Sequence, residues 1–422
     1  MRDTTKTLLA TTLLSAICAV PAFAQEGTTP SDDAAVVVID QVSLGDVFAD
    51  MFVVLDDVTP GASAVATATG NTSTAATETG DVDYNATQSQ QGDVSATTTL
   101  LGGPVYGGTA STYTTSYGNA ASSSTTNGTD FHYVTQESYG DVSASSDIYL
   151  DGADDVTATT TAAANVSSYE TEYGTNRGFQ EQRAYGDVTA TTVADMCCNN
   201  DTVTIASVAS GNTVSSYGWT TTSYNGAVQV TDTDSTISSD TDIRMQTGTS
   251  INGSATASGN SITVENEWGY ATLGRDGSEV FQGNGAEIEA VSTVSIDDWS
   301  GTSGSTAYGV GNSALISNIG SDTAMYANQE NYGDVSSYAS FDGASYDGSF
   351  GYVSSTAIGN AATATMCYSC SNDGVLSGRT NQTNSANVSA YGVARSNGGG
   401  FVQGAATAVG NSATYQSFGT NE

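Results

Sequence analysis

The stretch Glu137–Ala144, ESYGDVSA, returns along the chain with small changes. Close copies are RAYGDVTA, which ends at Ala190, and ENYGDVSS, which ends at Ser337; a looser copy, QQGDVSA, ends at Ala96. A catalytic motif is usually present once or twice, whereas a motif that recurs at a fixed interval is typical of a repeat architecture. The recurrence therefore indicates a repeat protein.

Two turn motifs alternate along the chain. Gly-Asn, or Ala-Asn in one copy, recurs at steps of 46 to 52 residues, at Asn71, Asn119, Asn165, Asn212, Asn260, Asn312, Asn360 and Asn411. Gly-Asp-Val recurs at Asp46, Asp93, Asp141, Asp187 and Asp334, with degenerate copies near Asp234, Glu287 and Asn387. Four of the intervals from an Asn to the next Asp are 22 residues, and the intervals after Asn260 and Asn360 are 27. We therefore expect a unit of about 48 residues that divides into two halves.

This unit predicts an all-β, elongated β-solenoid over residues 61–422, with coils of about 22 to 27 residues paired into repeats of about 48. Helical repeats need apolar stripes with a period of 3.6 residues, which are missing here, and Thr, Val, Tyr and Gly are poor helix formers. Propeller blades, which have roughly 40 to 50 residues each, fit the whole unit, but they do not explain its two equal halves.

Each recurring glycine is expected to give its corner a backbone conformation that other residues resist. The Asn or Asp that follows can bond to the local backbone, and equivalent Asn side chains of stacked coils can form an amide ladder. The predicted turn ladder comprises Asn71, Asp93, Asn119, Asp141, Asn165, Asp187, Asn212, Asn260, Asn312, Asp334, Asn360 and Asn411. Between corners the side chains alternate, and after Asp93 the inward ones are expected to be Val94, Ala96, Thr98 and Leu100.

The first residues are typical of an export signal. Arg2 and Lys6 precede an apolar run, Leu8–Val20, and an A-x-A cleavage site lies at residues 22–24, so residues 1–24 are predicted to be a signal peptide. Residues 25–60 contain two apolar runs, Val36–Ile39 and Met51–Leu55. These runs are expected to be strands that either cap the first coil or dock a partner.

The charge balance excludes some classes of partner. Without Arg2, Lys6 and Asp3, the 8 basic and 45 acidic residues become six arginines, no lysine and 44 acids, a formal net charge of −38. No basic patch is then available for nucleic acid, and the surface should be well solvated. Such a surface is expected to bind calcium loosely, but Gly-Asp-Val matches no calcium motif, so no cofactor is predicted.

The cysteines and the few candidate bases give little support to catalysis. Cys197, Cys198, Cys367 and Cys370 are predicted to form structural disulfides, of open connectivity, because the chain is exported. His132 is the only histidine, and it has no nucleophile motif around it. Paired acids such as Asp154-Asp155 leave a polysaccharide-cleaving enzyme as an alternative. Tyrosines beside the turns are expected to stack on sugar rings, on neighbouring chains or on one another inside the solenoid.

An exported, acidic chain with alternating Gly-Asn and Gly-Asp-Val turns resembles the holdfast anchor proteins of stalked alphaproteobacteria, of the HfaD type. The resemblance implies a non-enzymatic protein of the outer membrane or cell surface that anchors an adhesive polysaccharide, the holdfast, to the bacterial envelope. It implies as partners the holdfast polysaccharide, a curli-like companion anchor protein and an outer-membrane lipoprotein, through which the chain associates with the outer membrane. A self-assembling surface-layer or fibre subunit, and a secreted polysaccharide-active β-helix enzyme, are the alternatives.

Overall fold

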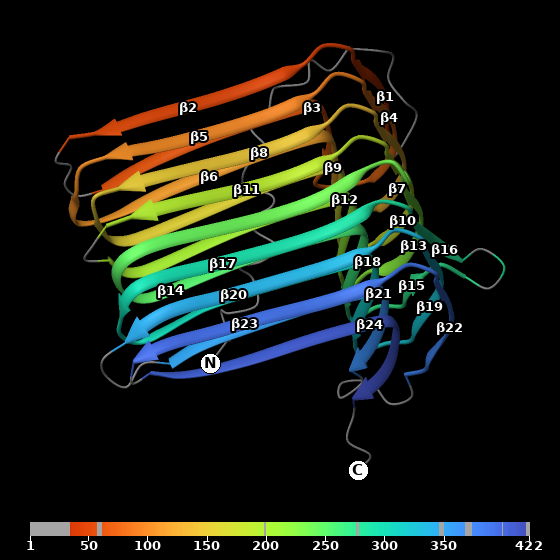
Figure 1. Ribbon diagram of the computed structural model, residues 1–422. Coiled ribbons are helices and arrows are strands. Elements are labelled where there is room, and N and C mark those ends of the chain that lie inside the picture. Colours follow the sequence, from red (N-terminus) through yellow and green to blue (C-terminus); the bar gives the residue numbers. More distant parts are fainter. Residues whose placement is uncertain are drawn as a thin grey trace.

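The computed structural model describes residues 34–56, 61–197, 200–275, 277, 279–345, 350–367, 374–398 and 400–418. The regular elements in these ranges are β-strands, and each strand pairing is parallel (Figure 1). In the same ranges, no helix is long and apolar enough to cross a membrane. The predicted signal peptide, residues 1–24, lies outside the described residues.

The strands form three columns, and each coil adds to each of them. Column one holds β1 (Ala34–Ser43), β4 (Asp81–Gln90), β7 (Thr129–Ser138), β10 (Thr175–Ala184), β13 (Thr222–Thr231), β15 (Ala271–Leu273) with β16 (Val280–Asn284), β19 (Thr323–Asn331) and β22 (Leu376–Asn384). Column two holds β2 (Val47–Leu55), β5 (Val94–Gly102), β8 (Val142–Leu150), β11 (Val188–Met196), β17 (Glu287–Trp299), β20 (Val335–Ser345) and β23 (Val388–Gly398). Column three holds β3 (Gly61–Thr77), β6 (Val105–Thr126), β9 (Ala153–Glu172), β12 (Asn200–Trp219), β18 (Thr302–Ile319), β21 (Phe350–Cys367) and β24 (Phe401–Phe418). β14 (Thr236–Glu267) runs through columns two and three without a break.

One coil closes only after 46 to 53 residues. Asn71 is paired in register with Asn119, 48 residues later, and Asn331 with Asn384, 53 residues later. The predicted β-solenoid is confirmed, but the predicted coil of half this length is wrong. Because the backbone of Asn71 bonds to the coil that contains Asn119, the Asp93 between them lies on the same coil as Asn71 and not on the next one.

The longer coil makes the solenoid broad. Eight coils about 4.8 Å apart give a stack roughly 38 Å high. One strand of column three, such as the 20-residue β9, has a contour of about 66 Å at 3.3 Å per residue. The molecule is therefore not the slender rod that short coils would have made, as Figure 1 shows.

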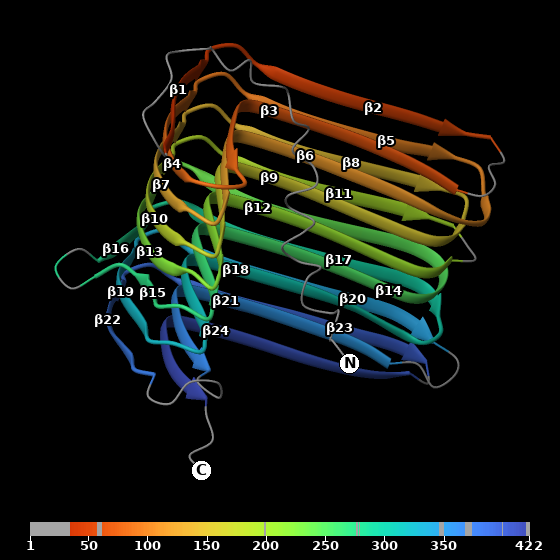
Figure 2. The same cartoon turned by 180° about the vertical axis from the view of Figure 1, so that it is seen from behind.

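Column three bends in the middle and divides each coil into two arms (Figure 2). In β9 the alternation of buried residues changes phase at Ala162–Asn165, which are all buried, so the strand turns its other face inward from there. The first arm consists of column two and the N-terminal half of column three, and its core contains Leu100, Ile148 and Val156. The second arm consists of column one and the C-terminal half of column three, and its core contains Val134, Tyr169 and Val214.

Within the first arm, the predicted alternation after Asp93 is confirmed. Val94, Ala96, Thr98 and Leu100 are at most 1% exposed, and the residues between them face outward. Small inward residues suit this arm because the two facing sheets approach closely, and Thr98 bonds to Thr114 of the opposite strand at 2.5 Å.

The turn glycines are needed for a different reason from the one predicted. A Cβ on Gly140 would lie 2.3 Å from the carbonyl oxygen of Gly92, and one on Gly118 would lie 2.6 Å from that of Ala164. Neither glycine is among the described residues with positive φ, such as Gly152 at 149°. The glycine therefore permits close stacking of neighbouring coils, and the expectation of a special backbone conformation is wrong.

β1 and β2 belong to the first coil, which β3 completes. They pair in register with β4 and β5 along their whole length. Val37 and Val53 point toward the core and are partly buried. On the outward face of these two strands, where Asp40 and Asp50 are also exposed, five apolar side chains are 63 to 73% exposed: Val36, Val38, Phe48, Phe52 and Val54. We call these five residues the apolar collar.

Candidate functional site

The Gly-Asn motifs form one continuous ladder at the bend of column three. Asn119 donates from Nδ2 to Oδ1 of Asn165 in the next coil at 2.8 Å, and seven such bonds of 2.7 to 2.9 Å run without interruption. The six inner members are 0% exposed. The ladder comprises Asn71, Asn119, Asn165, Asn212, Asn260, Asn312, Asn360 and Asn411.

The second amide hydrogen of each ladder member from Asn71 to Asn360 crosses the bend. Asn119 donates it to the carbonyl oxygen of Glu137 at 2.9 Å, four residues before Asp141. The Gly-Asn and Gly-Asp-Val motifs of one coil therefore meet where the two arms join. The interval from Asn119 to Asp141 is the second arm of one coil, measured out to its tip and back. The longer intervals hold their extra residues between β15 and β16 and between β21 and β22.

The Gly-Asp-Val motifs form a second, exposed column beside the bend. Asp141 accepts the backbone N–H of Asp187 on Oδ1 at 2.9 Å, and Asp93 accepts that of Asp141 at 3.0 Å. In the next coil Thr236, and not the predicted Asp234, takes this place, since its N–H donates to Asp187. Asp334 accepts from the backbone and side chain of Asn387, which lowers the pKa of Asp334.

A third ladder was missed from the sequence. Gln136 donates from Nε2 to Oε1 of Gln88 at 2.8 Å and to the carbonyl oxygen of Val166 at 3.0 Å. Equivalent bonds join Gln41, Gln88, Gln136, Gln182, Gln229, Gln282, Gln329 and Gln382. The signal was present, because seven of the eight glutamines stand five residues before the Asp position of the corner that follows.

The cysteine-bearing segments lie at different tips of the coil. Cys197 follows β11, at the far end of the first arm, whereas Cys367 ends β21, at the far end of the second arm. Cys198 and Cys370 lie outside the described residues. The predicted disulfides stay a prediction.

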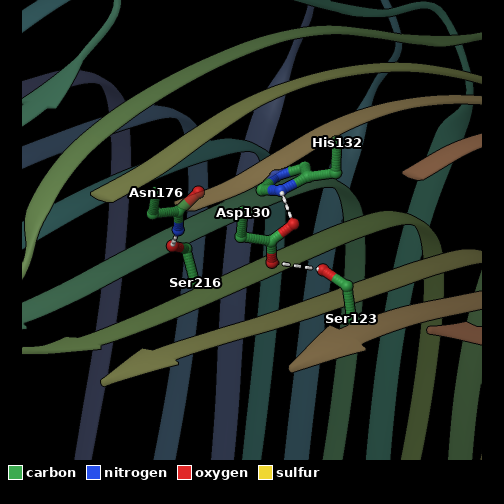
Figure 3. Close-up of polar contacts among 5 residues, drawn as sticks. All are labelled: Ser123, Asp130, His132, Asn176 and Ser216. Carbon is green, nitrogen blue, oxygen red and sulfur yellow. Dashed lines mark hydrogen bonds and ion pairs between the residues drawn. The ribbon is translucent and has the colours of Figure 1, made fainter. Parts of the chain in front are cut away.

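A buried polar cluster surrounds the only histidine (Figure 3). Asp130, which is 0% exposed, accepts from Ser123 Oγ at 2.5 Å, and its other oxygen lies 3.4 Å from Nδ1 of His132. His132 stacks on Tyr169 with ring centroids 3.6 Å apart. Burial raises the pKa of Tyr169, which keeps its phenol neutral. Within the cluster, Ser123 contacts the carboxylate of Asp130 and not the imidazole of His132.

A groove of about 670 Å³ lies on the outer face of column one, over β4, β7, β10, β13 and β15, and Asp83 and His132 contribute to its lining. One row across these strands holds Phe131, Arg177 and Tyr224, which are direct register partners. The Arg177 guanidinium lies between the two rings, 5.7 Å from the Phe131 centroid and 5.4 Å from that of Tyr224. All three residues line the groove.

A parallel row lies two residues further along the strands. Tyr133 and Phe179 stack at 5.6 Å with an interplanar angle of 13°, and the third place is Gly226, which has no side chain. At the end of the groove the sheet opens, because β15 stops at Leu273 and the chain turns away at Gly274, where φ is 71°. Tyr270 and Arg275 border the groove there.

The tyrosines thus lie both inside the solenoid and on its surface, and their stacking on sugar rings stays a prediction. Tyr169 and Tyr117 are buried, whereas Tyr224 and Tyr133 are more than 40% exposed in the groove. Among the described residues, no group of three or more His, Cys, Asp or Glu could hold a metal ion.

Residues 56–334, more than half of the chain, match a family model described as HfaD, holdfast attachment protein D. The match runs from the end of β2 to the Gly-Asp-Val corner before β20. No curated protein and no solved structure matches the chain. The family match confirms both the resemblance inferred from the turns and the expected anchoring role. The chain belongs to the HfaD family of holdfast attachment proteins, which anchor the holdfast to the cell envelope.

Proposed function

We propose that this chain is a non-enzymatic tether of the outer membrane that contacts the holdfast polysaccharide directly and is held there by companion anchor proteins. The observation that carries the proposal is the unbroken ladder from Asn71 to Asn411. Each coil is joined to the next by backbone bonds along three columns and by buried side-chain amides. A load applied to one coil is therefore shared by many parallel bonds, as an anchor requires.

The buried cluster supports a non-enzymatic role. Acyl transfer by a serine needs a histidine that contacts the serine and is oriented by the carboxylate. Here the carboxylate of Asp130 lies between Ser123 and His132. His132 lines the groove but is only 3% exposed, so its ring offers little surface to a polymer that lies there.

The apolar collar supports docking to a protein partner. Val36, Val38, Phe48, Phe52 and Val54 place large apolar side chains in water on two strands of one coil. An exposed apolar patch next to an open strand edge is typical of a surface that accepts a partner strand. We assign this surface to a companion anchor protein, the curli-like subunit or the outer-membrane lipoprotein.

Deletion of the gene tests the tether. Cells without the protein should still make the adhesive but release it into the medium, and they should detach under flow. Complementation with the natural gene should restore retention. Retained attachment under flow in the deletion strain would contradict the tether.

A second experiment tests the alternative of a polysaccharide-active enzyme. The purified protein is incubated with acidic and neutral polysaccharides, and new reducing ends and unsaturated products are measured. We expect none above the level of a heat-denatured sample; product formation that rises with protein concentration would overturn the non-enzymatic assignment.

A further inference from the structure

The groove on column one differs in charge from the rest of the molecule. Four of the six arginines that follow the signal are paired with acids: Arg183 with Glu181, Arg244 with Asp242, Arg379 with Glu279 and Arg395 with Asp342. Within the described part of the chain, Arg177 and Arg275 form no salt bridge, and both line the groove. Asp83, the register partner of Phe131, is the one acid among the described residues of the lining, so two arginines still leave the groove with a net positive charge in a chain with 45 acidic residues.

Flat aromatic rings surround this positive charge. Phe131 and Tyr133 are 41% and 46% exposed, so one edge or face of each ring is open to solvent. Cation–π contacts hold Arg177 between the rings of Phe131 and Tyr224, and no carboxylate of the described residues forms a salt bridge with it. Aromatic faces pack against the C–H faces of sugar rings, and a guanidinium binds a carboxylate through two parallel N–H donors.

We propose that this groove binds acidic sugar residues of the holdfast polysaccharide, with the sugar ring on Tyr133 and Phe179 and its acidic group on Arg177 and Arg275. The proposal rests on the proposed function, in which the chain touches the polysaccharide directly. Gly226 gives room to the ring of Phe179, because a Cβ there would lie 3.0 Å from its Cδ2, and the sugar would lie on the outer face of that ring. The opening after β15 lets a long polymer enter and leave the groove.

The acidic surface of the protein repels an acidic polysaccharide at long range. The repulsion between an acidic polymer and the protein is screened over about 8 Å at physiological ionic strength, whereas direct contacts inside the groove are screened less. Binding should therefore persist, or strengthen, when salt is raised from low to physiological concentration. Non-specific binding to scattered arginines would weaken over the same range.

The test measures affinity of the full exported protein for polygalacturonate, for alginate and for neutral dextran by affinity electrophoresis. Arg177→Gln and Phe179→Ala should each weaken binding to an acidic polymer at least tenfold. Arg244→Gln is the matched control, since it removes the same charge from an exposed arginine of the first arm. Thermal unfolding of each variant shows whether the fold is kept.

Three outcomes would overturn the assignment of the groove as a binding site. These are no binding of either acidic polymer, equal binding of dextran, or equal losses of affinity in Arg177→Gln and Arg244→Gln. Holdfast polysaccharide isolated from the cells separates this failure from that of the proposed function. If the natural protein binds it and Arg177→Gln binds it equally, the groove is wrong and the tether stands. If the natural protein does not bind it, direct contact with the polysaccharide fails as well.

Discussion

Gln136 donates its side-chain amide to Gln88, 48 residues earlier, at 2.8 Å. The asparagine ladder has the opposite direction, because Asn119 donates to Asn165 in the following coil. A row of aligned amides sums its dipoles as the peptide units of a helix do. Two rows of opposite direction in one coil cancel much of that sum, whereas in the last coils the short row Asn284, Asn331 and Asn384 adds to the direction of the asparagine ladder.

The asparagine ladder should make a large contribution to stability. Asn212→Ala removes the acceptor of Asn165 and the donor to both Asn260 and the carbonyl oxygen of Val230. Three buried polar groups are then left unpaired, and we expect the free energy of unfolding to fall by about 3 to 5 kcal/mol. Asn411→Ala, at the open end, breaks one ladder bond and should cost about 1 kcal/mol. Equal losses in denaturant unfolding would contradict this account.

The turn glycines offer a matched pair in the same motif. Gly140→Ala places a methyl group 2.3 Å from the carbonyl oxygen of Gly92, so we expect destabilisation of about 2 kcal/mol. Gly45→Ala occupies the equivalent corner of the first coil, where a Cβ meets nothing within 4 Å. It should be neutral or stabilise by about 0.5 kcal/mol, through the unfolded state. Thermal unfolding of the two variants tests this account. Similar losses of stability in Gly140→Ala and Gly45→Ala would show that the glycine is needed for its backbone conformation and not for close stacking.

These two predictions show where sequence reasoning succeeded and where it stopped. The step from Asn71 to Asn119 marks residues that stack, so the repeat and its ladder could be read directly. The coil length could not be predicted from the sequence, because an interval such as Asn119 to Asp141 does not show which strands pair with each other. Two arms of similar length imitate two short coils.

The groove was hidden for another reason. Phe131, Arg177 and Tyr224 lie in one row, but they differ in chemistry and share no motif, so only the register brings them together. The glutamine ladder could have been found, since Gln136 and its equivalents keep a constant distance from the next corner. The turn motifs do not include it, because Gln136 and its equivalents lie within strands and not at the corners.

The Asp column predicts a dependence on pH. Hydrogen bonds from the backbone and side chain of Asn387 lower the pKa of Asp334, so the carboxylate stabilises the fold above its unfolded pKa. This contribution is lost as pH falls through the lowered folded pKa. Asp334→Ala should therefore reduce the melting temperature at pH 7 and have almost no effect near pH 2. If the difference in melting temperature between Asp334→Ala and the natural protein stayed constant from pH 7 to pH 2, the charge of the Asp334 carboxylate would not contribute to stability.

The apolar collar can be tested in cells without unfolding the protein. Phe48→Ser and Phe52→Ser remove outward rings that are 68% and 64% exposed, so stability should change little. If a companion anchor protein binds there, the double variant should be exported normally but should shed the holdfast under flow. Phe401→Ser, at 63% exposure in the last coil, is the control and should retain it. Full retention by the collar variant would remove the docking surface from the proposal.

Deletion of a whole coil separates the observed coil from the half-unit. Removal of residues 94–141 joins Asp93 to Val142, so that Asn71 faces Asn165 and Gln88 faces Gln182 in the register they had before. Each coil of a solenoid contacts only its neighbours, so the shortened chain should keep a cooperative β-sheet transition. Removal of residues 120–141 instead takes away the second arm of one coil and leaves Gln88 without Gln136. That variant should lose its cooperative transition in circular dichroism and elute as aggregate; if it folded as well as the first, the half-unit would after all be a complete turn of the backbone.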